Sequence, residues 1–190
     1  MTDLIFIRHG ETDWNLEGRW QGQADVPLNA AGLAQADLLA RQIFDRYQPD
    51  AIYSSDLVRA RQTAEPLALA CGLPVLIDTR LREIHQGEWQ GMLVTDIRAR
   101  YGSEFENRHS DPWRVAPPGG ETAAQVRDRL EAAIRDITAA HPQGTVLIFT
   151  HGFIMAVARV ICDGAPLEQI WDLVPEHCTP FPLSCARIAL

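Results

Sequence analysis

Residues 5–10 read IFIRHG and residues 147–152 read LIFTHG, and these two stretches decide the fold. Each is a short apolar run that ends in His-Gly, which is typical of a strand buried on both faces of a sheet. In open α/β sheets, ligands bind outside the carboxyl ends of the strands. We therefore expect His9 and His151 to face one crevice, and Gly152 to let backbone amides approach a ligand closely.

Further apolar runs alternate with helix-forming stretches along the chain. We expect helices from Asn29 to about Tyr47, Asp56 to about Cys71, Glu121 to about Ala140 and Phe153 to Ile161, with strands at 4–7, 51–53, 74–77 and 145–150. This alternation predicts a three-layer α/β/α sandwich with a mostly parallel central sheet. At 190 residues the chain suits a single domain over residues 1–190, in which residues 91–116 form an excursion that can act as a lid.

The composition argues against several classes of protein. The net charge is −8, which argues against a nucleic-acid partner because such a surface needs a broad basic face. All 17 basic residues are arginine, so chemistry that needs a P-loop or Schiff-base lysine is excluded. Residues 1–7 lack the pattern of a leader, and no segment approaches the ~18 apolar residues of a membrane span. We expect a cytoplasmic protein without a membrane partner.

Arginines and a carboxylate are expected at the same edge of the sheet as the two histidines. Arg8 is adjacent to His9, and Arg59 falls in the first turn of the helix that follows strand 51–53. Arginine forks bind phosphate through charge-assisted hydrogen bonds, and a helix N-terminus adds donors. Glu83 follows the third strand and is placed to protonate a leaving oxygen. Such a site needs no metal.

Five blocks of sequence, taken in order, resemble the histidine phosphatase (phosphoglycerate mutase-like) superfamily. They are RHGETDWN at 8–15, SSDLVRARQTA at 54–64, LREIHQGEWQG at 81–91, PGGET at 118–122 and FTHGF at 149–153. RHG alone is a weak signal, but five ordered blocks are specific because independent chance matches multiply. The resemblance implies the α/β/α fold and the phosphatase branch of that superfamily, similar to broad-specificity and alpha-ribazole phosphatases.

The resemblance also implies a role for each matching residue. His9 would be the nucleophile that becomes phosphorylated and Glu83 the acid-base residue, with neither a cofactor nor a metal. The residues implied to bind phosphate are Arg8, Arg59, His151 and Asn15. Those implied near the substrate are Gln21, Gly22, Glu121, Thr122 and Gly152. Arginines and a protonated His151 would stabilise charge on the equatorial phosphoryl oxygens.

Alternatives stay open for several residues. Glu88 is a rival of Glu83 for the acid-base role, and His85 fits a structural interpretation as well as a substrate contact. The other histidines, interpreted as surface residues, are His109, His141 and His177. The cysteines lack CxxC spacing and are interpreted as structural or incidental, and they are Cys71, Cys162, Cys178 and Cys185.

Three other functions compete with a phosphatase. A cofactor-dependent phosphoglycerate mutase is disfavoured because the stretch between Glu83 and His151 is short and the chain has no lysine. A metallohydrolase would show HExxH or HxH, and neither occurs. An inactive phospho-ligand-binding module is disfavoured because every core residue is present. The expected partner is a small phosphorylated metabolite whose identity stays open. Whether the protein forms a homodimer, and how the chain is laid out after His177, also stay open.

Overall fold

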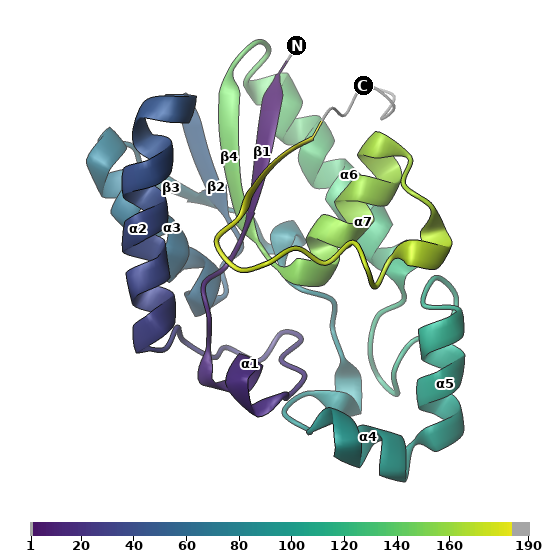
Figure 1. The fold of residues 1–190 in the computed structure, drawn as a ribbon. Helices are drawn as coiled ribbons and strands as arrows, with labels where there is room; N and C mark the ends of the chain where they lie inside the picture. The colour runs from purple at the N-terminus through teal and green to yellow at the C-terminus, as the bar shows by residue number, and fades with distance from the viewer. Residues whose placement is uncertain (1, 184–190) are drawn as a thin grey trace.

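The computed structural model describes residues 2–183, in which strands and helices alternate (Figure 1). The strands are β1 (Asp3–Arg8), β2 (Ala51–Ser54), β3 (Val75–Ile77), β4 (Thr145–Thr150) and β5 (Pro180–Leu183). The α-helices are α1 (Asp13–Glu17), α2 (Ala30–Tyr47), α3 (Val58–Cys71), α4 (Val94–Arg100), α5 (Gly102–Ser110), α6 (Ala123–Ala140) and α7 (Gly152–Asp163). Short 3-10 helices are η1 (Thr79–Leu81), η2 (Gly87–Trp89) and η3 (Leu167–Gln169).

The strands form one sheet in the order β3-β2-β4-β1-β5. The first four strands are parallel, and β5 runs antiparallel along β1. In the pairing of β1 with β4, Arg8 lies opposite Thr150. His9 and His151 therefore leave neighbouring strands at the same edge, which is the arrangement that the two His-Gly endings predict.

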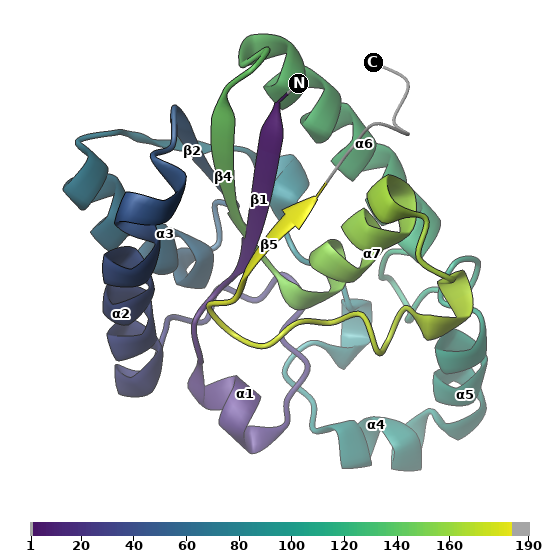
Figure 2. The same cartoon turned by 45° about the horizontal axis from the view of Figure 1, so that its top comes forward.

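Alternate residues of the strands pack on opposite faces of the sheet. Leu4 and Phe6 join a core with α6 and α7, whereas Ile5 and Ile7 join a second core with α2 and α3. Burial on both faces explains why the strands read as nearly continuous apolar runs. The sheet lies between these two helical layers in both views (Figures 1 and 2), so the predicted three-layer α/β/α sandwich is confirmed.

Residues 91–116 leave the sheet and form α4 and α5 beyond the carboxyl ends of the strands (Figure 1). A small separate core holds this excursion together, with Trp89, Ile97 and Phe105 buried and Trp20 packed against them. The excursion was predicted, but its helices were not. Neither helix has a side-chain hydrogen bond at its N-cap, so the usual start signal is missing.

The chain after His177 returns to the sheet as β5, the part whose layout the sequence left open. Cys162 is buried, while Cys71 and Cys178 are half-buried. Cys185 lies outside the described residues. Within residues 2–183, no helix combines the length and apolar character that a membrane crossing requires.

Candidate active site

A cavity of about 250 Å³ opens at the carboxyl ends of β1 and β4. Its walls are formed by Arg8, His9, Asn15, Arg19, Trp20, Gln21, Gly22, Arg59, Glu83, Gln86, Gly152, Phe153, Trp171 and Val174. Most of the residues singled out from the sequence therefore lie together. His151 does not line the cavity but is buried beside His9, whereas Glu121 and Thr122 lie away from the cavity walls.

His9 is buried in a defined tautomer. Its Nδ1 lies 2.7 Å from the carbonyl oxygen of Gly10, and because a carbonyl can only accept, Nδ1 carries the proton. Burial, and then the positive charges of Arg59 and Arg8, hold the pKa of His9 well below its ordinary value. His9 is therefore a neutral imidazole whose Nε2 keeps a lone pair for nucleophilic attack.

The loop that carries His9 is fixed to two helices. The Gly10 amide donates to Thr63 Oγ1 at 3.0 Å, and Thr63 donates to the Arg59 carbonyl at 2.7 Å. A Cβ atom added to Gly10 would lie 2.7 Å from the carbonyl oxygen of Gly32 in α2. The glycine is thus required by close packing against α2, and the packing fixes the direction of the His9 ring.

Arg8 and Arg59 bring positive charge to the cavity. Arg59 donates through Nη1 and Nη2 to the carbonyls of Ala24 and Gly22, at 2.7 and 2.8 Å, and Arg8 donates through Nη1 to Pro175 at 2.7 Å. Burial lowers the pKa of Arg8, and lowers the pKa of Arg59 to about 10, so both stay charged at neutral pH. The Nε atom of each arginine has no partner within residues 2–183, which leaves N–H donors for an anion.

His151 lies beside His9, with their ring centroids 5.2 Å apart. In the described part of the chain neither of its ring nitrogens has a hydrogen-bond partner. Burial, and then the charge of Arg59, hold the pKa of His151 well below its ordinary value. In the free protein this lowered pKa favours a neutral His151 imidazole, so the protonated His151 expected beside phosphoryl oxygens stays a prediction for the bound state. A phosphate dianion bound beside it would raise that pKa.

Glu83 is held at the N-terminus of α7. Its Oε1 accepts from the amide of Ile84 at 2.9 Å and its Oε2 from the amide of Phe153 at 3.1 Å. Both bonds fix the carboxylate at the cavity wall. Glu88, the rival candidate, is exposed and accepts from the Tyr101 hydroxyl at 2.9 Å, away from the cavity. The geometry favours Glu83 as the acid-base residue.

Glu121 and Thr122 make hydrogen bonds to neighbouring segments of the fold. Glu121 accepts from the His85 amide at 2.8 Å and pairs with Arg129 at 3.0 Å, and Arg129 donates to the Glu83 carbonyl at 3.0 Å. Thr122 is the N-cap of α6. Neither residue lines the cavity, and the contacts of Glu121 position the segment that bears Glu83, so their expected contact with substrate stays a prediction. His85 sits in the same network, which favours its structural interpretation.

His177 was interpreted as a surface residue, and that interpretation is wrong. It is half-buried, its Nδ1 donates to the carbonyl of His9 at 2.8 Å, and the two ring centroids are 5.5 Å apart. Other cavity residues that were given no role from the sequence are Arg19, Gln86, Phe153, Trp171 and Val174. His177, Trp171 and Val174 follow α7 and reach the site because β5 folds back along β1, a long-range pairing without a local signal.

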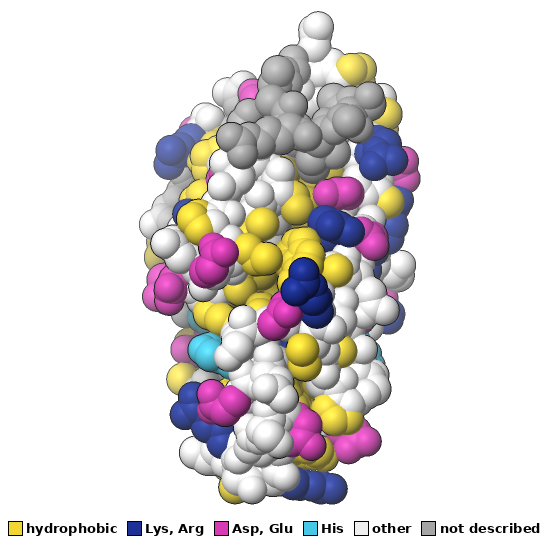
Figure 3. All heavy atoms as spheres, turned by 90° about the vertical axis from the view of Figure 1, so that its right-hand side faces the viewer, with side chains coloured by type: hydrophobic (Ala, Val, Ile, Leu, Met, Phe, Trp, Pro, Cys, Tyr) yellow, Lys and Arg dark blue, Asp and Glu magenta, His cyan; other side chains and the backbone are white. Residues whose placement is uncertain are grey.

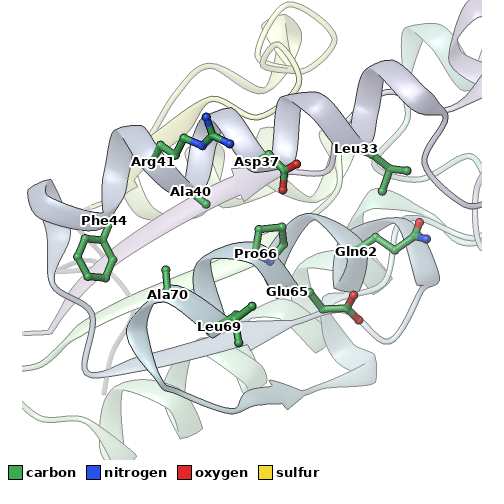
Figure 4. Close-up of a pocket in the computed structure, with 10 residues that line it drawn as sticks. All are labelled: Leu33, Asp37, Ala40, Arg41, Phe44, Gln62, Glu65, Pro66, Leu69 and Ala70. Carbon is green, nitrogen blue, oxygen red and sulfur yellow. The ribbon is translucent and has the colours of Figure 1, made fainter.

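A larger hollow, of about 740 Å³, lies between α2 and α3 (Figure 4). Its walls combine apolar side chains with Asp37, Glu65 and Arg41, and they include no histidine. Two carboxylates against one arginine do not suit a phosphate dianion. The smaller cavity at His9 is the better active-site candidate because it holds a neutral imidazole and several cations. In residues 2–183, no cluster of three or more His, Cys, Asp or Glu side chains could hold a metal ion.

A family model described as the histidine phosphatase superfamily (branch 1) matches residues 4–184. The chain belongs to the histidine phosphatase superfamily. Phosphoserine phosphatase 1 of Hydrogenobacter thermophilus is 36% identical to it over 172 residues, which cover 90% of this chain and 81% of the relative. The predicted family, and a phosphatase within it, are confirmed.

Solved phosphatases share the fold of this histidine phosphatase. The mycobacterial glucosyl-3-phosphoglycerate phosphatase complex with VO3 superposes with a TM-score of 0.84 at 34% identity, covering 96% of this chain and 92% of the other. The alpha-ribazole phosphatase from Shigella flexneri gives a TM-score of 0.82 at 28% identity, covering 95% and 89%. The predicted likeness to the phosphatase branch is therefore confirmed.

Proposed function

We propose that this histidine phosphatase hydrolyses phosphate monoesters of small metabolites through a phosphohistidine on His9, with Glu83 as the proton donor and without a metal or cofactor. One observation carries the proposal. His9 is a neutral imidazole with its Nδ1 proton committed to Gly10, and it shares a cavity with Arg8 and Arg59. A nucleophile beside fixed cations is the arrangement that phosphoryl transfer needs.

Two chemical steps follow from this arrangement. In the first, Nε2 of His9 attacks phosphorus in line, the P–O bond to the leaving group breaks, and Glu83 as the acid protonates the leaving oxygen. In the second, Glu83 as the carboxylate takes a proton from water, whose oxygen attacks phosphorus and releases His9. The Nδ1–H bond to Gly10 stabilises the positive charge on the phosphorylated ring between the two steps.

The remaining cavity residues orient the phosphate and the substrate. Arg8, Arg59 and His151 would contact the phosphoryl oxygens. Asn15 joins them, because its Oδ1 already accepts from the backbone amide and hydroxyl of Thr12, which leaves its Nδ2 to donate. Residues proposed to contact the rest of the substrate are Gln21, Gly22 and Gly152.

Hydrolysis should dominate over the mutase reaction. A mutase must keep water from the phosphohistidine and hold a bisphosphate while it reorients, which calls for a longer closing insertion than the short stretch between Glu83 and His151. Mixing the protein with 3-phosphoglycerate and a trace of 2,3-bisphosphoglycerate separates the two activities. Phosphate release faster than isomerisation is expected, and faster isomerisation would identify a mutase. No cleavage of any aryl phosphate would indicate an inactive binding module.

We further propose a cytoplasmic protein whose partner is a small metabolite, with neither a nucleic acid nor a membrane as partner. Acidic and basic side chains are interspersed on the face shown in Figure 3, and they form no broad basic area there. A homodimer would cover the exposed apolar side chains Leu33, Phe44 and Leu69 on α2 and α3 (Figure 4). Light scattering of the purified protein tests the dimer, and a monomeric mass would exclude it.

We propose one domain with residues 91–116 as its lid. Trp20 supports this because it lines the cavity and also packs on the core of the excursion, with its ring centroid 5.5 Å from that of Trp89. Closure of the lid would thus change the position of Trp20 in the cavity wall. Quenching of tryptophan fluorescence by phosphate, together with one cooperative unfolding transition, is the expected result.

A further inference from the structure

Arg108 on α5 is a buried cation that the proposed mechanism does not use. Its side chain is 0% exposed. Within residues 2–183, none of its three guanidinium nitrogens has a hydrogen-bond partner. A buried charge without a hydrogen-bond acceptor costs free energy because it has lost its water and gained no acceptor in exchange.

The guanidinium groups of the buried Arg59 and the half-buried Arg129 have hydrogen-bond acceptors within the fold. Arg59 donates to two backbone carbonyls. Arg129 donates to Glu121 and to the carbonyls of Arg80, Arg82 and Glu83. The lack of any acceptor at Arg108 is therefore a local feature, and it points to an acceptor supplied by a ligand.

The guanidinium of Arg108 lies against the wall of the His9 cavity. Its central carbon is 5.3 Å from the ring centroid of Phe153 and 5.0 Å from that of Trp171. Both aromatic side chains line the cavity. Burial lowers the pKa of Arg108 to about 10, and the carboxylate of Glu83 opposes this shift, so the group stays charged at neutral pH close to the proposed acid.

The end of α5 that carries Arg108 is fixed to the cavity wall. Trp171 Nε1 donates to the carbonyl of His109 at 2.9 Å. The His109 ring stacks on Trp171 at 5.4 Å and on Phe105 at 6.3 Å between centroids. Trp171 is half-buried and lines the cavity, whereas Arg108 lies behind it and does not, so a ligand reaches Arg108 only if the Trp171 indole moves aside.

We propose that Arg108 binds a carboxylate group of the substrate, so that the protein prefers phosphate monoesters that carry a carboxylate. This inference rests on the proposed function. Arg8 and Arg59 would hold the phosphate beside His9, and Arg108 would hold the second anionic group at the aromatic end of the cavity. A carboxylate suits the site because its two coplanar oxygens match the guanidinium fork and its single charge neutralises a single cation.

Two substrates that differ at the carboxylate test this inference in the unmodified protein. O-Phosphoserine and O-phosphoethanolamine share the leaving oxygen and the ammonium group, and only the first carries a carboxylate. We expect kcat/KM to be at least about tenfold higher for phosphoserine, the usual scale for a charge-assisted contact. An equal kcat/KM for both substrates would overturn the proposal.

Arg108→Met keeps the length of the side chain and removes the charge. We expect it to lower the ratio of the two kcat/KM values by about tenfold or more. Arg108→Lys, which keeps the charge without the fork, should fall in between, and it serves as the second variant if the methionine protein does not fold. The matched control is Arg98→Met, because Arg98 is exposed and packs its guanidinium carbon 5.0 Å from the Phe105 ring centroid in the same lid. Its ratio should not change.

The outcomes separate this inference from the proposed function. Equal losses on both substrates in the Arg108 variants would show that the residue only supports the lid, which contradicts the proposal. If the ratio of the two kcat/KM values is unchanged in the Arg108 variants while p-nitrophenyl phosphate is still hydrolysed, the proposed phosphatase activity stands and the carboxylate site is contradicted. Failure of the unmodified protein to hydrolyse p-nitrophenyl phosphate would instead contradict the proposed function.

Discussion

Glu121 and Arg129 form an ion pair at 3.0 Å that holds the segment bearing Glu83. Arg129 also donates to the carbonyl of Glu83 at 3.0 Å and to that of Arg82 at 2.7 Å. Its side chain is only 17% exposed, so solvent screens these contacts weakly. The pair therefore fixes the backbone of the proposed acid without contacting the cavity.

Arg129→Met should lower both stability and turnover. The loss of the pair and of the carbonyl contacts is expected to reduce the free energy of unfolding by about 2 kcal/mol. Turnover should fall about tenfold with little change in KM, because Glu83 would be less well positioned. Urea unfolding and steady-state kinetics measure the two effects. Arg127→Met is the control, since Arg127 pairs with the exposed Asp128 on the same helix.

A different result for Arg129→Met would contradict the positioning role of Arg129. A large rise in KM with unchanged stability would place the Glu121–Arg129 pair in substrate binding, a role that the family resemblance implied for Glu121 alone. The control variant should stay within about 0.5 kcal/mol of the unmodified protein, the usual range for an exposed pair.

Stability should fall as the pH is lowered from about 7 to about 5. The pKa values of His9, His151 and His177 are all lowered in the folded protein, with burial as the main cause. In the unfolded chain these groups titrate near ~6.5. Below that pH the unfolded chain binds protons that the folded state does not. The contribution of the three neutral histidines to the free energy of unfolding is therefore complete above ~6.5 and is lost as the pH falls.

Urea unfolding at a series of pH values measures this dependence. Each depressed histidine contributes a slope of at most about 1.4 kcal/mol per pH unit. His151→Asn should flatten the dependence because it removes one of the three groups. A free energy of unfolding that stays constant across the same range would contradict the neutral, buried state of these histidines.

Glu83→Gln should discriminate between leaving groups. Proton donation matters most for an alkoxide, so turnover of an alkyl phosphate is expected to fall by about 10²–10⁴-fold. Nitrophenolate leaves without help, so turnover of p-nitrophenyl phosphate should fall much less. Stopped assays of phosphate release from both substrates supply the comparison, and equal losses would point to Glu88 or water as the proton donor.

Much of the fold was predictable because its signals are local. The two His-Gly endings at His9 and His151 predicted parallel strands that share an edge. The helix after Asn29 begins where its cap predicted, with Asn29 Oδ1 accepting from the amide of Gly32 at 2.8 Å. The helices α4 and α5 were missed because their stability comes from packing around Trp89 and not from caps or periodicity.

The site likewise contains residues with a local sequence signal and residues without one. His9, Arg8 and Arg59 lie at strand or helix ends that the sequence marks, and the structure brings them into one cavity. His177 and Trp171 reach that cavity from a segment whose path depends on the pairing of β5 with β1, which no short motif encodes. Glu121 shows the reverse case, since a residue within the matching block at 118–122 is bound to Arg129 and lies away from the cavity walls.

The covalent intermediate on His9 is the central claim, and trapping it is the most direct test. The protein is mixed with a ³²P-labelled phosphate monoester, quenched in alkali without acid, digested and mapped. Label is expected on the peptide that contains His9, and His9→Ala should carry no label and release no phosphate, because the mechanism requires a phosphohistidine. Label on another residue, or phosphate release by the His9→Ala protein at the unmodified rate, would contradict the account.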